Sequence, residues 1–499
     1  MKTGLRAAAL AIFLFFACLC GAQTVSFTLV HINDVHDITP AAGGKGGAIA
    51  RLATLKKQLL RDDPNTFLIL AGDYFSPSAI ASAKVDGKRL AGRHMVDLLN
   101  AVGLDFLTFG NHEFDLSESE FKERMSEVRA RWASANVRNA AGEPWPGVPD
   151  HIVFTVDDGK GNAIKVGIFG VTINSNKAPY VRYLDAMQAA REQAELLRPQ
   201  VDVLIALTHE AWEQDQQLVS TLPVDLLLGG HDHENMQLWR GPNGVPMFKA
   251  DANLRSTYVH KLHFDKRTKK LTIDSRLTFL TPAIAEDAAV AKLADQWMER
   301  GFAAFRQAGF EPRQHVANIP VLLDGREAKV RSGSTNLTEL IGRALLNEAP
   351  GAEASIYNSG SIRFDDVLPA GPVTQYDVIR VMPFGGTVVD VQMKGELLEK
   401  VLNAGRAQKG KGGWLQTGNI DFAAETGAYR IGGAPLDRTR TYRIATNDFL
   451  MRGGELGIEF LTREAPGVVS ATDKRDIRFA VIEELKRLGG GVPPAVAQP

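Results

Sequence analysis

Cysteine is scarce in this chain of 499 residues: Cys18 and Cys20 are the only two. Beyond them no disulfide can stabilise a fold, and no catalytic mechanism can use a thiol. Charge of either sign is not in excess, because 57 Lys and Arg oppose 58 Asp and Glu, a net charge of −1. This balance excludes a broad basic surface, so nucleic acid is not an expected partner. The apolar content of 44% is ordinary for a globular protein.

Long apolar runs are also lacking, and the chain has no expected membrane span. The longest run, residues 7–20, follows Lys2 and Arg6 and is shorter than the roughly 18–20 residues of a spanning helix. Small residues follow it, so residues 1–22 are predicted to be a signal peptide, and the protein is predicted to be exported, periplasmic or secreted. The alternatives are an uncut anchor, an N-terminal core helix, or a lipid at Cys18, for which the preceding residues are a poor signal.

Short apolar strands alternate with helical patterns from about residue 25 to residue 280. The predicted strands are Phe27–Ile32, Phe67–Ala71, Phe106–Phe109, Val166–Val171, Val203–Thr208 and Leu226–Leu228. The predicted helices are Ala48–Leu60, Leu90–Val102, Ser117–Ala133 and Asp185–Leu197, and Tyr258–Phe264 and Leu271–Leu277 form a closing hairpin. Continuously apolar strands between helices are typical of a layered α/β domain.

A long helix, Glu286–Phe305, has its apolar residues at helical spacing and precedes a change of pattern. The later chain mixes strands (Ala354–Tyr357, Val388–Gln392, Tyr442–Thr446) with helices (Asn336–Asn347, Gly395–Asn403, Lys474–Leu488). We therefore predict a first domain over residues 23–285, a linker helix over 286–312 and an α+β domain over 313–499.

Polar clusters follow five of the strands in the first domain. They contain Asp34 and His36, Asp73, Asn111-His112-Glu113-Phe114-Asp115, His209, and His231 with His233. Since sites form at the carboxyl ends of strands in open α/β sheets, these side chains should converge. We expect their neighbours His31 and Asn33 to face away from that site.

Carboxylate, amide and imidazole groups are ligands for hard to borderline divalent cations. Each cluster alone is a weak signal, but five in succession are hard to explain without a shared metal site. Asp73 lies in a tight Gly-Asp turn and is the candidate to bridge two ions, an arrangement that suits phosphoryl displacement.

The order Asp34-x-His36, Gly72-Asp73, Gly110-Asn111-His112-Glu113, His209, Gly230-His231-x-His233 resembles the calcineurin-like metallophosphoesterase superfamily. In the second domain Asn358-Ser-Gly-Ser-Ile-Arg363, Pro383-Phe384-Gly-Gly and Asn447-Asp-Phe449-Leu resemble the C-terminal domain of the 5′-nucleotidase family. That family includes UDP-sugar hydrolases and 2′,3′-cyclic phosphodiesterases. The resemblance implies a four-layer α/β/β/α sandwich followed by an α+β nucleotide-binding domain.

The resemblance also implies roles for single residues. It gives Asp34, His36, Asp73 and His233 to one divalent ion (Zn, Mn, Co or Mg), and Asp73, Asn111, His209 and His231 to a second. His112 matches the catalytic histidine, and Asp115 would orient its ring. Six residues of the second domain match substrate-binding positions: Arg331, Asn358, Arg363, Phe384, Phe449 and Glu455. Glu455 stands where the family usually has the aspartate that binds ribose.

The expected function is therefore that of an exported enzyme with two divalent metal ions. It would release phosphate from nucleoside 5′-monophosphates or related nucleotides by attack of a metal-bound hydroxide, at a cleft between its domains. Alternatives within the family are a UDP-sugar hydrolase, a 2′,3′-cyclic nucleotide phosphodiesterase or a hydrolase of another ester. A nucleotide-binding or adhesion protein with a silent site is the alternative outside enzymes.

Overall fold

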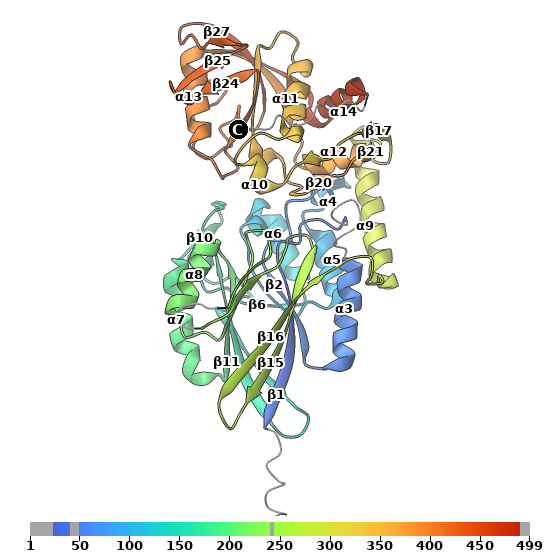
Figure 1. The fold of residues 1–499 in the computed structure, drawn as a ribbon, viewed down its shortest axis with the longest axis vertical. Helices are drawn as coiled ribbons and strands as arrows, with labels where there is room; N and C mark the ends of the chain where they lie inside the picture. Colours follow the sequence, from blue (N-terminus) through green and yellow to red (C-terminus); the bar gives the residue numbers. More distant parts are fainter. Residues whose placement is uncertain (1–22, 40–48, 240–243, 490–499) are drawn as a thin grey trace, which may run out of the picture. The chain divides into compact units, whose positions relative to one another are not determined.

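The computed structural model describes residues 23–39, 49–239 and 244–489 (Figure 1). The predicted signal peptide and Cys18 lie outside these ranges. The described chain forms two compact units. The first contains most of residues 23–294, and the second contains residues 295–489 together with residues 77–90. The division falls within helix α9 (Ala288–Gln307), where sequence analysis predicts the linker helix.

Two six-stranded sheets form the first unit. One has the order β16-β15-β1-β2-β5-β6, and the other has the order β13-β14-β12-β11-β9-β8. The first sheet comprises β1 (Thr24–Ile32), β2 (Thr66–Ala71), β5 (Phe106–Thr108), β6 (Arg131–Trp132), β15 (Ser256–Asp265) and β16 (Lys270–Phe279). The second comprises β8 (His151–Asp157), β9 (Ala163–Thr172), β11 (Val203–His209), β12 (Leu226–Gly229), β13 (Met236–Leu238) and β14 (Met247–Lys249).

The apolar core lies between these two sheets, because both contribute buried side chains to one cluster. Phe27 and Leu29 of β1 belong to it together with Ile168 of β9 and Ile205 of β11. A second cluster joins the outer face of β9, β11 and β12 to helices α7 (Ala186–Leu197) and α8 (Trp212–Thr221). Helices α3 (Ile49–Asp62), α5 (Arg93–Val102) and α6 (Glu118–Glu127) lie on the other side (Figure 1). The four-layer α/β/β/α prediction is confirmed.

One predicted helix of the first domain is too long. Residues 117–133 fit a helical pattern, but α6 ends at Glu127, and Arg131–Trp132 pairs with β5 as strand β6. The Trp132 ring is buried, with its centroid 4.4 Å from that of Phe109. Tertiary packing of this aromatic side chain therefore outweighs the local helical pattern. Short elements of the first unit complete it: β7 (Val137–Asn139), β10 (Val181–Tyr183) and the 3₁₀ turns η1 (His112–Asp115) and η2 (Arg198–Gln200).

A five-stranded mixed sheet of order β23-β19-β27-β22-β28 is the centre of the second unit. Its strands are β19 (Ala354–Asn358), β22 (Thr387–Lys394), β23 (Leu415–Gly418), β27 (Thr441–Asn447) and β28 (Val468–Asp476). Smaller strands surround it: β17 (His315–Ile319), β18 (Leu323–Asp324), β20 (Val367–Leu368), β21 (Gly371–Thr374), β24 (Ile420–Ala423), β25 (Ala428–Ile431) and β26 (Ala434–Pro435). The helices are α10 (Glu327–Val330), α11 (Asn336–Glu348), α12 (Gln375–Val381), α13 (Gly395–Arg406) and α14 (Ile477–Leu488), with the 3₁₀ turn η3 (Ser359–Ser361). This is the predicted α+β pattern.

Residues 77–90 belong to the second unit although they lie within the sequence of the first. They form helix α4 (Ala79–Ser82) and the hairpin of β3 (Lys84–Val85) and β4 (Lys88–Arg89). Ile80 is fully buried and packs against Gly301 of α9. A Cβ added at Gly301 would lie only 2.5 Å from the Ile80 side chain. The sequence pattern gave no signal for this assignment.

Candidate metal centre

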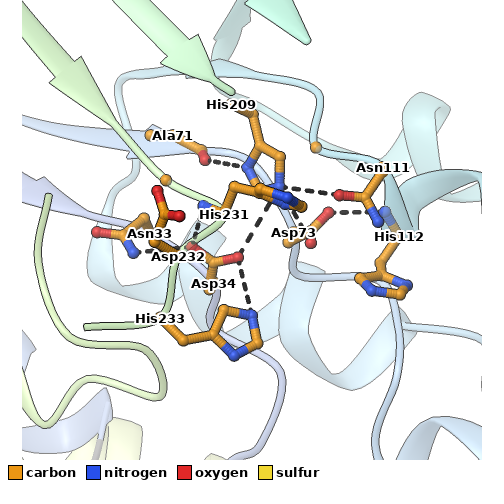
Figure 2. A network of polar contacts seen from close by, with 12 residues as sticks. Asn33, Asp34, Ala71, Asp73, Asn111, His112, His209, His231, Asp232 and His233 are labelled. Atoms are coloured by element: carbon orange, nitrogen blue, oxygen red, sulfur yellow. Dashed lines mark hydrogen bonds and ion pairs between the residues drawn. The ribbon is translucent and has the colours of Figure 1, made fainter. Parts of the chain in front are cut away.

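The carboxyl ends of β1, β2, β11 and β12 bring the predicted metal ligands together (Figure 2). Asp34, Asp73, His231 and His233 all have positive φ angles, between 51° and 83°. Positive φ is costly for residues other than glycine and is concentrated at functional sites. The flanking sheets therefore hold these four side chains in strained turns, all at one edge of the unit.

Two groups of side chains have donor atoms close enough together to hold a metal ion. Asp34, His36 and His233 form one, and Asp34, Asp73 and His209 form the other. Asp34 Oδ1 lies 3.4 Å from His233 Nε2 and 3.9 Å from His209 Nε2, whereas Asp73 Oδ2 lies 3.2 Å from His209 Nε2. Asp34 is thus the member that the two groups share, and a bridging role for Asp73 stays a prediction.

The remaining predicted ligands lie beside these groups. Asn111 Oδ1 is 3.2 Å from His209 Nε2, and the backbone N–H of His231 donates to Asp34 Oδ2 over 2.9 Å. The ring centroids of His209 and His231 are 5.3 Å apart. All seven residues proposed as metal ligands are therefore neighbours at one place.

The chemistry of these donors fits divalent cations. Asp34 Oδ1 and Asp73 Oδ2 are buried and accept no hydrogen bond of regular geometry from a described residue. His36 Nδ1 contacts the Ser76 carbonyl oxygen (2.9 Å) and so carries the proton, which leaves a lone pair on Nε2, 3.4 Å from His233 Nε2. Buried carboxylate oxygens and an imidazole lone pair facing one space are the groups that a metal ion satisfies.

The electrostatics of the site agree with this fit. Burial lowers the pKa of His36 to about 4 and that of His231 to about 3, so both rings are neutral near pH 7, the form that binds a metal. Burial also disfavours charge on His209, but Asp73 and Asp34 outweigh it and raise its pKa to about 10. The two carboxylates thus favour a positive charge beside them, from a proton on His209 or from a metal ion.

His112 and Asp115 form the predicted pair. Asp115 Oδ2 lies 2.8 Å from His112 Nδ1, which leaves Nε2 as the ring nitrogen available to a substrate. The backbone N–H of His112 donates to Asp73 Oδ1 over 2.7 Å, so this residue is fixed to the metal edge. Ser76 Oγ and Asn176 Nδ2 donate to the Asp115 carboxylate (3.0 and 2.8 Å) and hold it in place.

Sequence analysis missed the role of Glu113, which is fully buried. Its carboxylate accepts from the backbone N–H groups of Asp73, Tyr74, Phe75 and Gly110, over 2.5–3.3 Å. Glu113 therefore joins the loop after β2 to the loop after β5. Burial and the nearby Asp73 raise its pKa to about 7. Its place directly after His112 was the signal, but spacing alone does not show that a carboxylate binds backbone amides.

The expectation for Asn33 was wrong, because its side chain faces the site: Asn33 Nδ2 donates to Asp34 Oδ2 over 2.8 Å. The two residues are adjacent, but Asp34 leaves the extended conformation with φ 51°, so the alternation of a regular strand no longer applies. His31 lies between the sheets, where its Nε2 contacts the carbonyl oxygen of Gly229 (3.1 Å). Asn253, also missed, accepts the backbone N–H groups of His36 and Asp37.

The predicted substrate residues of the second unit form a separate group. Asn358 Nδ2 donates to Glu455 Oε2 over 2.8 Å, and the Arg363 guanidinium lies over the Phe384 ring, 5.7 Å from its centroid. Arg331 is paired with Glu327 and lies within electrostatic range of Arg363 and Glu455. Phe384 is 51% exposed, and Phe449 is partly exposed, so neither ring is a core residue.

Three members of this second group carry buried charge that a ligand could bind. Arg363 Nε is buried and has no hydrogen-bond partner among the described residues. Burial lowers the pKa of Arg331 and raises that of Glu455. An anion would satisfy the paired guanidinium groups, since guanidinium binds phosphate and carboxylate oxygens.

Two family models match the chain, one over the candidate metal ligands and the other over the substrate-binding candidates of the second unit. Residues 27–235 match the family model of the calcineurin-like phosphoesterases, and residues 315–463 match that of the 5′-nucleotidase C-terminal domain. Together with the buried cluster of candidate metal ligands, these matches define a metal-dependent phosphoric ester hydrolase. The chain belongs to the 5′-nucleotidase family, in which a metallophosphoesterase domain precedes this C-terminal domain.

Individual relatives resemble the chain over most of its length. The trifunctional nucleotide phosphoesterase protein YfkN of Bacillus subtilis is 26% identical over 94% of this chain, which spans only 34% of that relative. Protein UshA of Yersinia enterocolitica is 26% identical over 87% of this chain and 86% of its own. The crystal structure of a 5′-nucleotidase precursor from Thermus thermophilus has a TM-score of 0.75 at 25% identity, covering 95% and 98% of the two chains.

A first test removes one carboxylate of the centre. Asp73→Ala should abolish hydrolysis of a generic aryl phosphate, because the carboxylate that faces His209 is lost. We expect fewer than two metal ions per chain in Asp73→Ala, measured by elemental analysis of the folded protein. Asp34→Ala, measured beside it, should retain fewer ions than Asp73→Ala if Asp34 is the shared ligand. Wild-type turnover in Asp73→Ala, or full activity of the wild type in excess chelator, would contradict the two-metal assignment.

Proposed function

We propose that the protein releases phosphate from nucleoside 5′-monophosphates or related nucleotides. The observation that carries the proposal is the pairing of a buried carboxylate–imidazole cluster, beside His112 and Asp115, with a second group in which guanidinium, aromatic and amide side chains lie together. The first group suits the chemistry of a phosphate ester, and the second suits an anionic ligand that has a flat base. The names of the relatives support this reading.

Asp34, His36, Asp73, Asn111, His209, His231 and His233 would hold the metal ions. When bound, divalent ions at such a site acidify water and neutralise charge on phosphate oxygens. The chain's own contribution is His112, which Asp115 fixes through Nδ1. An imidazolium at this position is stabilised by the Asp115 carboxylate and can donate from Nε2 to the leaving oxygen.

Arg331 and Arg363 would bind acidic groups of the substrate, and Phe384 and Phe449 would stack on its base. A flat base has an apolar face, and the partly exposed rings offer it a partner without sequence preference. Glu455 would accept a hydrogen bond from a sugar hydroxyl. This division leaves the metal centre to act on any phosphate ester, while the second unit selects nucleotides.

The aromatic contribution can be measured by comparing two substrates. Stacking on one ring is worth on the order of 1–3 kcal/mol, so Phe449→Ala should lower kcat/KM for adenosine monophosphate about 5- to 150-fold. The value for a small aryl phosphate should change little, because that substrate needs only the metal centre. Phe422→Ala, which removes another partly exposed ring of the same unit, is the matched control. If Phe449→Ala slows adenosine monophosphate and aryl phosphate equally, the ring does not bind the base.

Asn447 determines which way the amide of Asn358 faces. The backbone N–H of Leu450 donates to Asn447 Oδ1 (2.9 Å), so Asn447 presents Nδ2 to Asn358 Oδ1 (3.0 Å). Ser361 Oγ also donates to Asn358 Oδ1, over 2.6 Å. The amide nitrogen of Asn358 must then face Glu455, which fixes that carboxylate by a charge-assisted hydrogen bond.

Asn447→Asp tests this orientation. The new carboxylate offers only acceptors, so the Asn358 amide should turn and place its oxygen against Glu455. A hydrogen bond to a charged group is worth about 1.5–3 kcal/mol, so kcat/KM for adenosine monophosphate should fall about 10- to 150-fold. The fall for 2′-deoxyadenosine monophosphate should be smaller. Asn403→Asp, which keeps the acceptor used by the Tyr429 hydroxyl, is the control. Equal losses for both nucleotides would exclude a role of Glu455 in sugar selection.

We also propose export, supported by Lys2, Arg6 and the short apolar run of residues 7–20. Among the described residues, no helix is both long and apolar enough to cross a membrane. Expression of the full sequence in a bacterial host should give a periplasmic or secreted protein that begins at Gln23, read by intact mass. A full-length chain in the cytoplasm would contradict export, and the mass of a diacylglyceryl group on Cys18 would show anchoring instead.

A further inference from the structure

Behind the metal centre lies a buried lysine that the chemistry described above does not use. Lys249 is the last residue of β14, and its side chain is 1% exposed. Its ammonium group donates to the carbonyl oxygens of Glu210 and Gly230, the latter over 2.8 Å. It also lies 2.8 Å from Asp215 Oδ2 on α8, and it pairs with Asp232.

The two carbonyl groups belong to residues that adjoin the candidate ligands. Glu210 directly follows His209 at the end of β11, and Gly230 directly precedes His231 at the end of β12. These strands are parallel neighbours, with Thr208 opposite Gly229. One ammonium group therefore connects the two turns from which His209, His231 and His233 extend.

The space around this ammonium group is filled. A Cβ added at Gly229 would lie 2.8 Å from Asp215 Oδ2 and 3.0 Å from Lys249 Cε. A side chain at this position would therefore crowd the lysine–carboxylate contact, since Cβ atoms are essentially never found within 3.0 Å of another atom. A buried ammonium group is costly unless it is paired and fully hydrogen-bonded. Lys249 meets that condition because its three N–H groups bind Glu210, Gly230 and Asp232, and Asp215 adds a second negative charge beside it.

We propose that Lys249 is a positioning residue for the metal centre. Its ammonium group holds the ends of β11 and β12 at the separation that lets His209 and the His231-x-His233 turn face the same ions. Groups that orient metal ligands change metal affinity about 10- to 100-fold when they are removed. The proposal concerns metal binding alone and does not depend on which phosphate ester is the substrate.

The test compares two buried lysines. Lys249→Met/Asp215→Asn removes the ammonium group and the buried Asp215 carboxylate together. Neither of these two groups is then left as an unpaired buried charge. The control, Lys56→Met/Asp105→Asn, removes a lysine that is 7% exposed and likewise binds a carbonyl, that of Gly103, and a carboxylate. Lys56 and Asp105 are not metal-binding candidates.

The readout is Mn²⁺ binding to chelator-treated full-length protein by titration calorimetry, with thermal unfolding measured beside it. We expect about 10- to 100-fold weaker Mn²⁺ binding for at least one ion in the Lys249 variant and wild-type affinity in the Lys56 variant. Folded Lys249 variant with wild-type affinity, or an equal loss in both variants, would overturn the proposal.

Gly229→Ala decides the matter if the Lys249 variant does not fold. It keeps every charge but crowds the lysine–carboxylate contact, because the new Cβ would lie 2.8 Å from Asp215 Oδ2 and 3.0 Å from Lys249 Cε. Mn²⁺ affinity should then fall in the folded protein. Unchanged affinity in folded Gly229→Ala would likewise overturn the proposal.

Discussion

Two buried carboxylates, Asp34 and Asp73, face one space and dominate the electrostatics of the metal centre. Each carries an oxygen without a regular hydrogen bond, and both lie within 4 Å of the His209 ring. Unpaired buried charge is too costly to keep unless a cation occupies the place. The sheets, the strained turns and the surrounding imidazoles can all be understood as the means of holding these two groups ready for positive charge.

The supporting contacts are made mainly to the backbone. Glu113 binds four N–H groups on one side of the centre, and Lys249 binds two carbonyl oxygens on the other. A negative group therefore gathers donors, and a positive group gathers acceptors, each at the end of two adjacent strands. Backbone contacts fix where a ligand-bearing turn lies without competing for the ligand atoms themselves.

Much of this site could be predicted from sequence because its ligands follow strands, and strands that are continuously apolar are easy to recognise. The strand ends indicated the polar clusters, and the family resemblance selected the candidate ligands within them: Asp34, His36, Asp73, Asn111, His209, His231 and His233. Asn33 was misplaced because positive φ at Asp34 breaks the alternation of the strand. Glu113 and Lys249 could not be assigned roles, because most of their partners lie far away in sequence and many of them are backbone groups. The short strand β6 was missed because its stability comes from the buried Trp132 and not from local pattern.

Because residues 77–90 belong to the second unit, the chain connects the two units at more than one place. A linear order of domain, linker helix and domain would give a single covalent connection, which one cut in α9 would sever. The described chain instead passes from one unit to the other at residues 76–77, 90–91 and 294–295. The first of these passages begins next to Ser76, whose carbonyl and hydroxyl groups contact His36 and Asp115. Cleavage confined to α9 would therefore release most of the second unit as a separate polypeptide, while residues 77–90 would stay on the fragment that carries His112 and Asp115.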